Sequence, residues 1–89
     1  MHELSIALSI IEGVEEELTK HEGASVSVVH LRMGPLSGVA KEALLFSYDI
    51  ACEGTRLQGS TLKIEDMPDG ADLQIFALEL IDDDTAPPC

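Results

Sequence analysis

The 89-residue sequence is poor in several residue types, and each scarcity narrows what the protein can be. It has only 2 cysteines, Cys52 and Cys89, too few for a disulfide framework or for a four-thiolate zinc site built by one chain. Aromatic residues make up 3% of the chain, and tryptophan is absent. Lysine and arginine number 5 against 17 acidic residues, a formal net charge of −12. This charge argues against a nucleic-acid binder or a protein of anionic membrane surfaces, since both need a basic face.

Long apolar runs and targeting features are also lacking. No stretch approaches the ~18–20 apolar residues that span a bilayer, and the first residues do not resemble a signal peptide. With so few cysteines, we expect a reducing, cytoplasmic setting. The acidic composition fits a cation-binding protein or a partner for basic surfaces, but it fits plain solubility as well.

The apolar fraction of 45% is enough for one small globular domain with a modest core. Apolar residues at helical spacing predict an amphipathic helix over residues 4–20, and β-branched residues predict a strand over 25–33. A second helix is predicted over 39–52, capped by Ser37 and ended by Gly54. Its apolar stripe is centred on Leu44 and Tyr48 and is extended by Val39, Phe46 and Ile50.

Two further strands are predicted over 61–67 and 73–81. Pro68-Asp69-Gly70 between them is a turn tripeptide, so we expect the last two strands to form an antiparallel hairpin. The element order α-β-α-β-β predicts an α/β (α+β) fold, a two-layer sandwich of two helices on a small three-stranded mixed sheet. Residues 1–81 would form the domain, and the acidic residues 82–89 a disordered tail.

No catalytic constellation is visible. No local signature pairs Cys52 or Cys89 with a histidine, the carboxylates are scattered, and there is no glycine-rich phosphate loop. We expect Cys52 to be a small buried thiol and Cys89 to be only a free thiol. His21, in a polar turn, and His30, on the less buried face of a strand, have ordinary structural interpretations. These patterns do not indicate an enzyme.

The chain start offers metal ligands. The α-amine of Met1, with a pKa near ~7.7–8.0, is followed at once by His2 and Glu3. The amine nitrogen, the backbone nitrogen of His2 and its imidazole can close adjoining chelate rings on one ion. The backbone nitrogen of Glu3, or its carboxylate, can supply a further ligand. Such nitrogen-rich sets favour Ni(II) and Cu(II). On spacing alone, however, a histidine at position 2 is more often accidental than a ligand.

Several ordered blocks resemble the HypA family of nickel-delivery proteins. They are Met1-His2-Glu3-Leu4-Ser5, residues 32–39, 42–46, 53–55, Gly59, 62–65 and the closing strand 73–80. The resemblance implies a nickel metallochaperone of hydrogenase, and sometimes urease, maturation, with Ni(II) held by Met1, His2 and Glu3. It also implies the accessory GTPase HypB and the hydrogenase large-subunit precursor as partners.

The chain departs from the family at one place. The family carries a zinc module with two CxxC pairs between the second and third strands, whereas here Pro68 is followed by Asp69-Gly70 and the last strand. A naturally zinc-less relative and an excised module both remain open, and we expect no structural zinc. The alternative to nickel delivery is a protein-interaction module in which His2 has no role, and a metal titration distinguishes the two.

Overall fold

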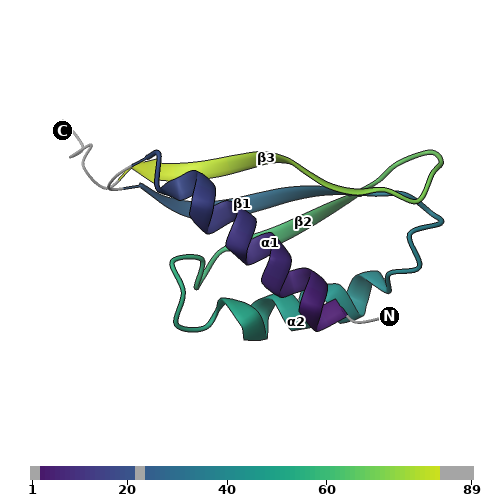
Figure 1. Ribbon diagram of the computed structural model, residues 1–89, viewed down its shortest axis with the longest axis horizontal. Coiled ribbons are helices and arrows are strands. Elements are labelled where there is room, and N and C mark those ends of the chain that lie inside the picture. The colour runs from purple at the N-terminus through teal and green to yellow at the C-terminus, as the bar shows by residue number, and fades with distance from the viewer. Residues whose placement is uncertain (1–2, 22–23, 83–89) are drawn as a thin grey trace.

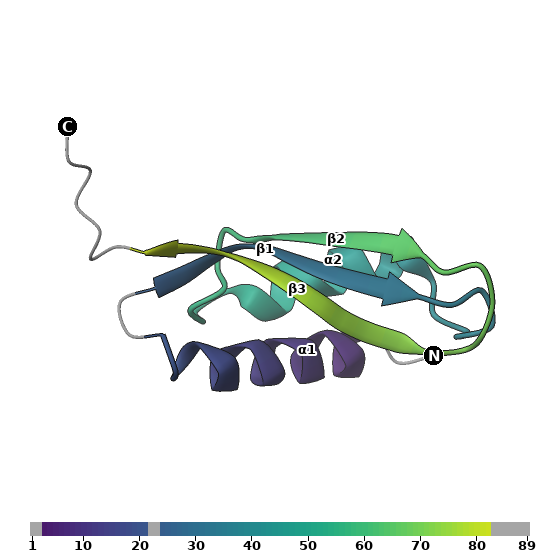
Figure 2. The same cartoon turned by 90° about the horizontal axis from the view of Figure 1, so that it is seen from above.

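The computed structural model describes residues 3–21 and 24–82. Within these ranges the elements are α1 (Glu3–Leu18), β1 (Ala24–Met33), α2 (Lys41–Cys52), β2 (Thr61–Asp66) and β3 (Leu73–Asp82). The strands form one mixed sheet, and both helices lie on the same face of it (Figures 1 and 2). The predicted α+β sandwich and its α-β-α-β-β order are confirmed. No helix among the described residues has the length and apolarity needed to cross a bilayer.

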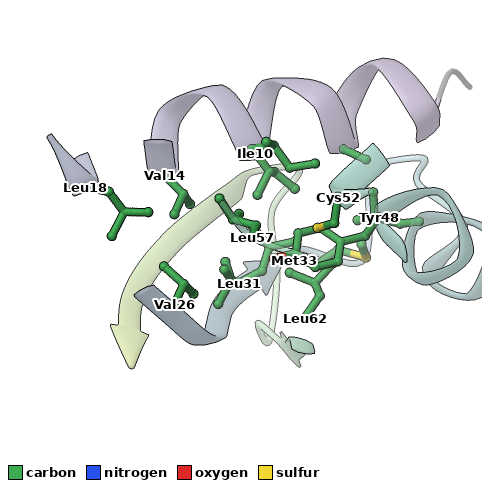
Figure 3. Close-up of a cluster of buried hydrophobic side chains, with 14 of the residues drawn as sticks. Ile10, Val14, Leu18, Val26, Leu31, Met33, Tyr48, Cys52, Leu57 and Leu62 are labelled. Atoms are coloured by element: carbon green, nitrogen blue, oxygen red, sulfur yellow. The ribbon is translucent and has the colours of Figure 1, made fainter. Parts of the chain in front are cut away.

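The core lies between the helices and the sheet. Figure 3 shows Ile10, Val14 and Leu18 of α1 above Leu31 of β1, with Tyr48 of α2 beside them. Leu18 and Tyr48 are fully buried. Burying one such side chain contributes about 1.5–3 kcal/mol, so these residues, together with the other buried members of the core, supply the apolar stabilisation of the domain.

The central strand is β1. It pairs in parallel with β2 and antiparallel with β3, so the strand order is β2-β1-β3. The predicted hairpin between the last two strands is therefore wrong. The physical reason is burial: β1 carries Val29 and Leu31, which are 0% and 1% exposed, and the central position covers both edges of this strand. A helical crossover through α2 then places β2 parallel to β1, as helical connections between strands do.

Residues 67–72 cross the end of β1 to reach its other side. The backbone N–H of Gly34 donates to the carbonyl of Asp72 at 2.8 Å, and that of Leu36 donates to the carbonyl of Gly70 at 2.9 Å. A Cβ on Gly34 would lie 2.7 Å from the carbonyl carbon of Gly70, so the two backbones can touch only because residue 34 is glycine. Gly70 has the positive φ, 95°, expected of the turn. The positive φ of Gly70 is as predicted, but the segment connects β2 to the far side of β1 and not to a neighbouring strand.

The start of α2 differs from the prediction. The helix begins at Lys41, its N-cap residue is Ala40, and no side chain of the cap residue bonds to the helix. Ser37 is therefore not the cap; its Oγ accepts a hydrogen bond from the backbone N–H of Val39 at 3.3 Å. The N–H of Ala40 donates instead to Oε2 of Glu3, at 3.1 Å, so the contact at this helix start comes from α1.

The apolar stripe of α2 is narrower than predicted. Leu44 and Tyr48 are fully buried, but Phe46 and Ile50 are 67% and 48% exposed, so the predicted extension of the stripe by these two residues is wrong. The helix ends as predicted, just before Gly54, whose φ of 80° a side chain would disfavour. The predicted disordered tail, residues 82–89, starts one residue too early, because Asp82 is the last residue of β3; residues 83–89 lie outside the described residues.

Candidate metal centre

Of the three predicted ligands, the structure describes Glu3. Met1 and His2 lie outside the described residues, and Glu3 is the first residue of α1. Its carboxylate reaches across to α2, where Oε2 accepts the 3.1 Å hydrogen bond from Ala40. The start of a helix presents backbone N–H groups without intrahelical acceptors and the positive end of the helix dipole, so a carboxylate there is favourable. Glu3 thus fixes the beginning of α1 against the beginning of α2.

A second contact fixes the same corner of the molecule. Lys41, the first residue of α2, places its Nζ 2.9 Å from Oδ1 of Asp66, the last residue of β2. Both side chains are well exposed, so this ion pair contributes little stability. Through these two contacts the start of α2 is tied both to the start of α1 and to the end of β2.

The contact of Glu3 distinguishes between its two possible modes of ligation. One carboxylate oxygen already accepts a hydrogen bond, so ligation through that oxygen would compete with the anchoring of α1 on α2. The backbone nitrogen of Glu3 belongs to the first turn of α1.

The cysteines form no metal site that the structure describes. Cys52 is buried, as predicted, beside Tyr48 and Ser60, and burial raises the pKa of its thiol. A thiol whose neutral form is favoured is a poor metal ligand, since thiolate is the coordinating form. Cys89 lies outside the described residues.

The two histidines that the structure describes each face a carboxylate. Nε2 of His21 lies 3.7 Å from Oε2 of Glu17, one turn earlier, and Nε2 of His30 lies 2.6 Å from Oε2 of Glu79 on β3. These contacts agree with the structural interpretation of both residues. No sequence signal could have paired His30 with Glu79, 49 positions away. Among the described residues, no three His, Cys, Asp or Glu side chains gather closely enough to hold a metal ion.

Comparison with known proteins bears on the chain start. Residues 1–72 match the family model described as hydrogenase/urease nickel incorporation, metallochaperone, hypA. The hydrogenase maturation factor HypA of Roseiflexus sp. (strain RS-1) is 54% identical over 76 residues, which are 85% of this chain and 58% of that protein. That of Thermomicrobium roseum is 46% identical over 68 residues, 76% of this chain and 52% of that protein. The hydrogenase maturation factor HybF of Salmonella typhimurium is 44% identical over 68 residues, 76% of this chain and 60% of that protein. The chain thus spans between about half and three-fifths of the length of these relatives.

Proposed function

Because the chain belongs to the HypA family of hydrogenase and urease nickel-incorporation metallochaperones, we propose that it binds one Ni(II) ion at its N-terminus and delivers it during maturation of a nickel enzyme such as nickel–iron hydrogenase. Nickel is cargo here, and the protein is a carrier and not a catalyst. The observation that carries the proposal is the opening Met1-His2-Glu3, with Glu3 anchored on α2.

The proposed ligands are four nitrogen atoms. The α-amine of Met1, the backbone nitrogen of His2 and its imidazole form two adjoining chelate rings, and the backbone nitrogen of Glu3 completes the set. The hydrogen bond from Ala40 to the Glu3 carboxylate supports this choice, because it leaves the side chain of Glu3 to hold the helix. A nitrogen-rich planar set suits Ni(II) and Cu(II), so Cu(II) is expected to bind at least as tightly.

Release follows from the position of the site at a chain terminus. A shallow terminal site exposes the ion, so a partner can replace the ligands one at a time. Ligand nitrogens must lose protons to bind, and nickel affinity is therefore expected to weaken as the pH falls below about 7. The partners we propose are the accessory GTPase HypB and the hydrogenase large-subunit precursor, in the cytoplasm.

The proposal is tested by calorimetric titration with nickel of four forms of the chain. The native chain should bind one ion. His2→Ala and a chain extended by one residue before Met1 should lose tight binding, because the first lacks the imidazole and the second turns the amine of Met1 into an amide. His21→Ala is the matched control: it removes an exposed histidine paired only with Glu17 among the described residues and should bind as the native chain does. Equal affinity of the extended and native chains would refute the terminal chelate.

Glu3→Ala separates the two roles of that residue. The backbone nitrogen remains in this variant, so one nickel ion should still bind. The free energy of unfolding should fall by about 0.5–2 kcal/mol, the usual cost of losing a side-chain contact at a helix start. Loss of nickel stoichiometry with an unchanged circular dichroism spectrum would instead identify the carboxylate as a ligand. If the native chain bound no stoichiometric nickel, the alternative of an interaction module without metal delivery would be favoured.

A further inference from the structure

β3 is an outer strand of the sheet and carries almost no charge. Between Leu73 and Ile81 its only charged residue is Glu79, in a chain whose net charge is −12. Large apolar side chains are nevertheless exposed along it: Ile75 is 40%, Leu80 38% and Ile81 51% exposed. The other outer strand, β2, has only 6 residues and includes three charges. Charges and shortness are the usual protection of a sheet edge, and β3 lacks both.

The helix layer leaves β3 partly open. A hollow of about 530 Å³ lies between α1 and β3. It is lined on the helix side by Gly13, Val14, Glu17 and His21, and on the strand side by residues 75–78 and Leu80. A second hollow, of about 380 Å³, continues toward the start of α1, beside Ser5 and Ser9. The small residues on this flank of α1 keep the helix from covering the strand, and a Cβ on Gly13 would meet nothing within 4 Å.

An irregularity in the pairing of β3 sets which of its residues face the helices. Leu31 of β1 pairs with Ile75 and His30 pairs with Ala77, so Phe76 is an extra residue between them. The ring of Phe76 lies against the guanidinium of Arg32, on the face without helices. From the register, four residues of β3 face the helices and four face away. The first four are Leu73, Ile75, Leu78 and Leu80, and the second are Gln74, Phe76, Ala77 and Glu79. From residue 73 to residue 80, the sequence of helix-facing and outward-facing positions is therefore the same in both directions along the strand.

We propose that β3 pairs antiparallel with β3 of a second copy, about a twofold axis between Phe76 and Ala77. In this register Leu73 lies opposite Leu80, and Ile75 lies opposite Leu78. Each helix-facing apolar residue therefore meets another, and a shift of one residue in either direction would set Ile75 opposite Ala77 or Glu79, on the wrong face. The two three-stranded sheets become one, and the hollows beside the two α1 helices adjoin each other across the axis.

The charges agree with a second copy as the occupant. Glu79 lies opposite Gln74 of the other copy, so the carboxylate meets an amide that can donate a hydrogen bond, and no like charges face each other within 73–80. Two bodies of charge −12 repel each other at long range, and salt screens that repulsion. Dimerisation should therefore tighten as salt rises. A basic segment of another protein, the other candidate for this edge, would bind more weakly in salt.

Sedimentation of the full chain over a dilution series, at ~50 and ~500 mM NaCl, tests the interface. Dimer is expected, and more of it at the higher salt. Ile75→Lys should raise the dissociation constant about tenfold or more, because it buries a charge opposite Leu78 of the other copy. Ile50→Lys on α2 is the matched control: Ile50 is 48% exposed, it undergoes the same substitution, and dimerisation should be unchanged. Circular dichroism checks that both variants fold.

Cross-linking tests the register. Directly opposed residues have Cα atoms about 4.5–5.5 Å apart, within the range that a disulfide spans. In a Cys89→Ser background, the double variant Gln74→Cys, Glu79→Cys should form a covalent dimer on mild oxidation. Each single variant places its two copies five positions apart along the paired strands and should not. A monomer at every concentration in high salt, equal effects of the two lysine variants, or efficient cross-linking by a single variant would each overturn the proposal.

Discussion

Replacing Gly34 by alanine tests the close backbone contact between residue 34 and the crossing segment 67–72. The added Cβ would lie 2.7 Å from the carbonyl carbon of Gly70 and 3.1 Å from the backbone nitrogen of Ala71. Both are backbone atoms, so no side chain can rotate away to make room. The crossing segment must move, which weakens its two hydrogen bonds, from Gly34 to Asp72 and from Leu36 to Gly70.

The expected cost follows from these contacts. Two weakened hydrogen bonds cost about 2 kcal/mol. Overpacking against fixed atoms adds about 1–3 kcal/mol. Alanine reduces the conformational freedom of the unfolded chain, which returns about 0.4–1 kcal/mol. Gly34→Ala should therefore lower the free energy of unfolding by about 2–4 kcal/mol.

Urea unfolding followed by far-ultraviolet circular dichroism measures this, since the chain has no tryptophan and one tyrosine. Gly13→Ala is the matched control. A Cβ at that position of α1 meets nothing within 4 Å, and alanine is the better helix former by about 0.5–1 kcal/mol. The same chemical change should thus destabilise at one site and stabilise at the other. If Gly34→Ala were neutral or stabilising, the tight crossing would be refuted.

Three further predictions concern the core and the pH dependence of stability. The Tyr48 hydroxyl donates to Ser60 Oγ at 2.7 Å, and Ser60 Oγ itself donates to the carbonyl of Leu57, so Tyr48→Phe should cost about 1 kcal/mol. Ser60→Ala, which leaves the buried Tyr48 hydroxyl without this acceptor, should lower the thermal midpoint further. Burial raises the pKa of Cys52 and of Tyr48 above their ordinary 9.0 and 10.0. The folded state then keeps protons that the unfolded chain releases, so the thermal midpoint should be level below about pH 9 and fall above it, and less steeply in Cys52→Ala. A midpoint that stayed level through pH 10.5 would contradict this linkage. Finally, a strong chelator should leave the circular dichroism spectrum and the melting curve of the purified chain nearly unchanged, and a marked loss of structure would indicate a structural metal.

Local pattern is enough to place most of the secondary structure. The buried residues of α1, among them Ala7, Ile11 and Val14, repeat at the period of a helix, and this repeat is legible without knowing what they pack against. Strand order cannot be predicted from local pattern in this way, because it depends on which strand buries the most apolar surface when both of its edges are covered. Pro68-Asp69-Gly70 is correctly recognised as a turn, yet nothing within it states whether the chain returns beside β2 or crosses to the far side of β1.

The same limit applies to the candidate site. Met1 and His2 can be recognised only from the sequence, because the pattern of donor atoms lies in consecutive residues. The hydrogen bond between Ala40 and the Glu3 carboxylate is visible only in the structure, since the two residues are 37 positions apart. Ser37 was the best local candidate for the helix cap, but a distant carboxylate occupies that place. Phe46 and Ile50 have the spacing of core residues, and only the position of the sheet shows that they face outward.

The crossing over β1 also bears on how such a domain can evolve. In a hairpin the turn sets the register of its two strands, so an insertion there would disturb their pairing. Here β3 takes its register from β1 through hydrogen bonds of its own, which the contacts of Gly70 and Asp72 with Leu36 and Gly34 extend. Doubling the length of such a connection costs only about 0.6 kcal/mol in loop entropy. A longer turn at residues 68–69 would therefore leave the pairing of β3 with β1 intact, whereas an insertion at residues 70–72 would disturb the crossing.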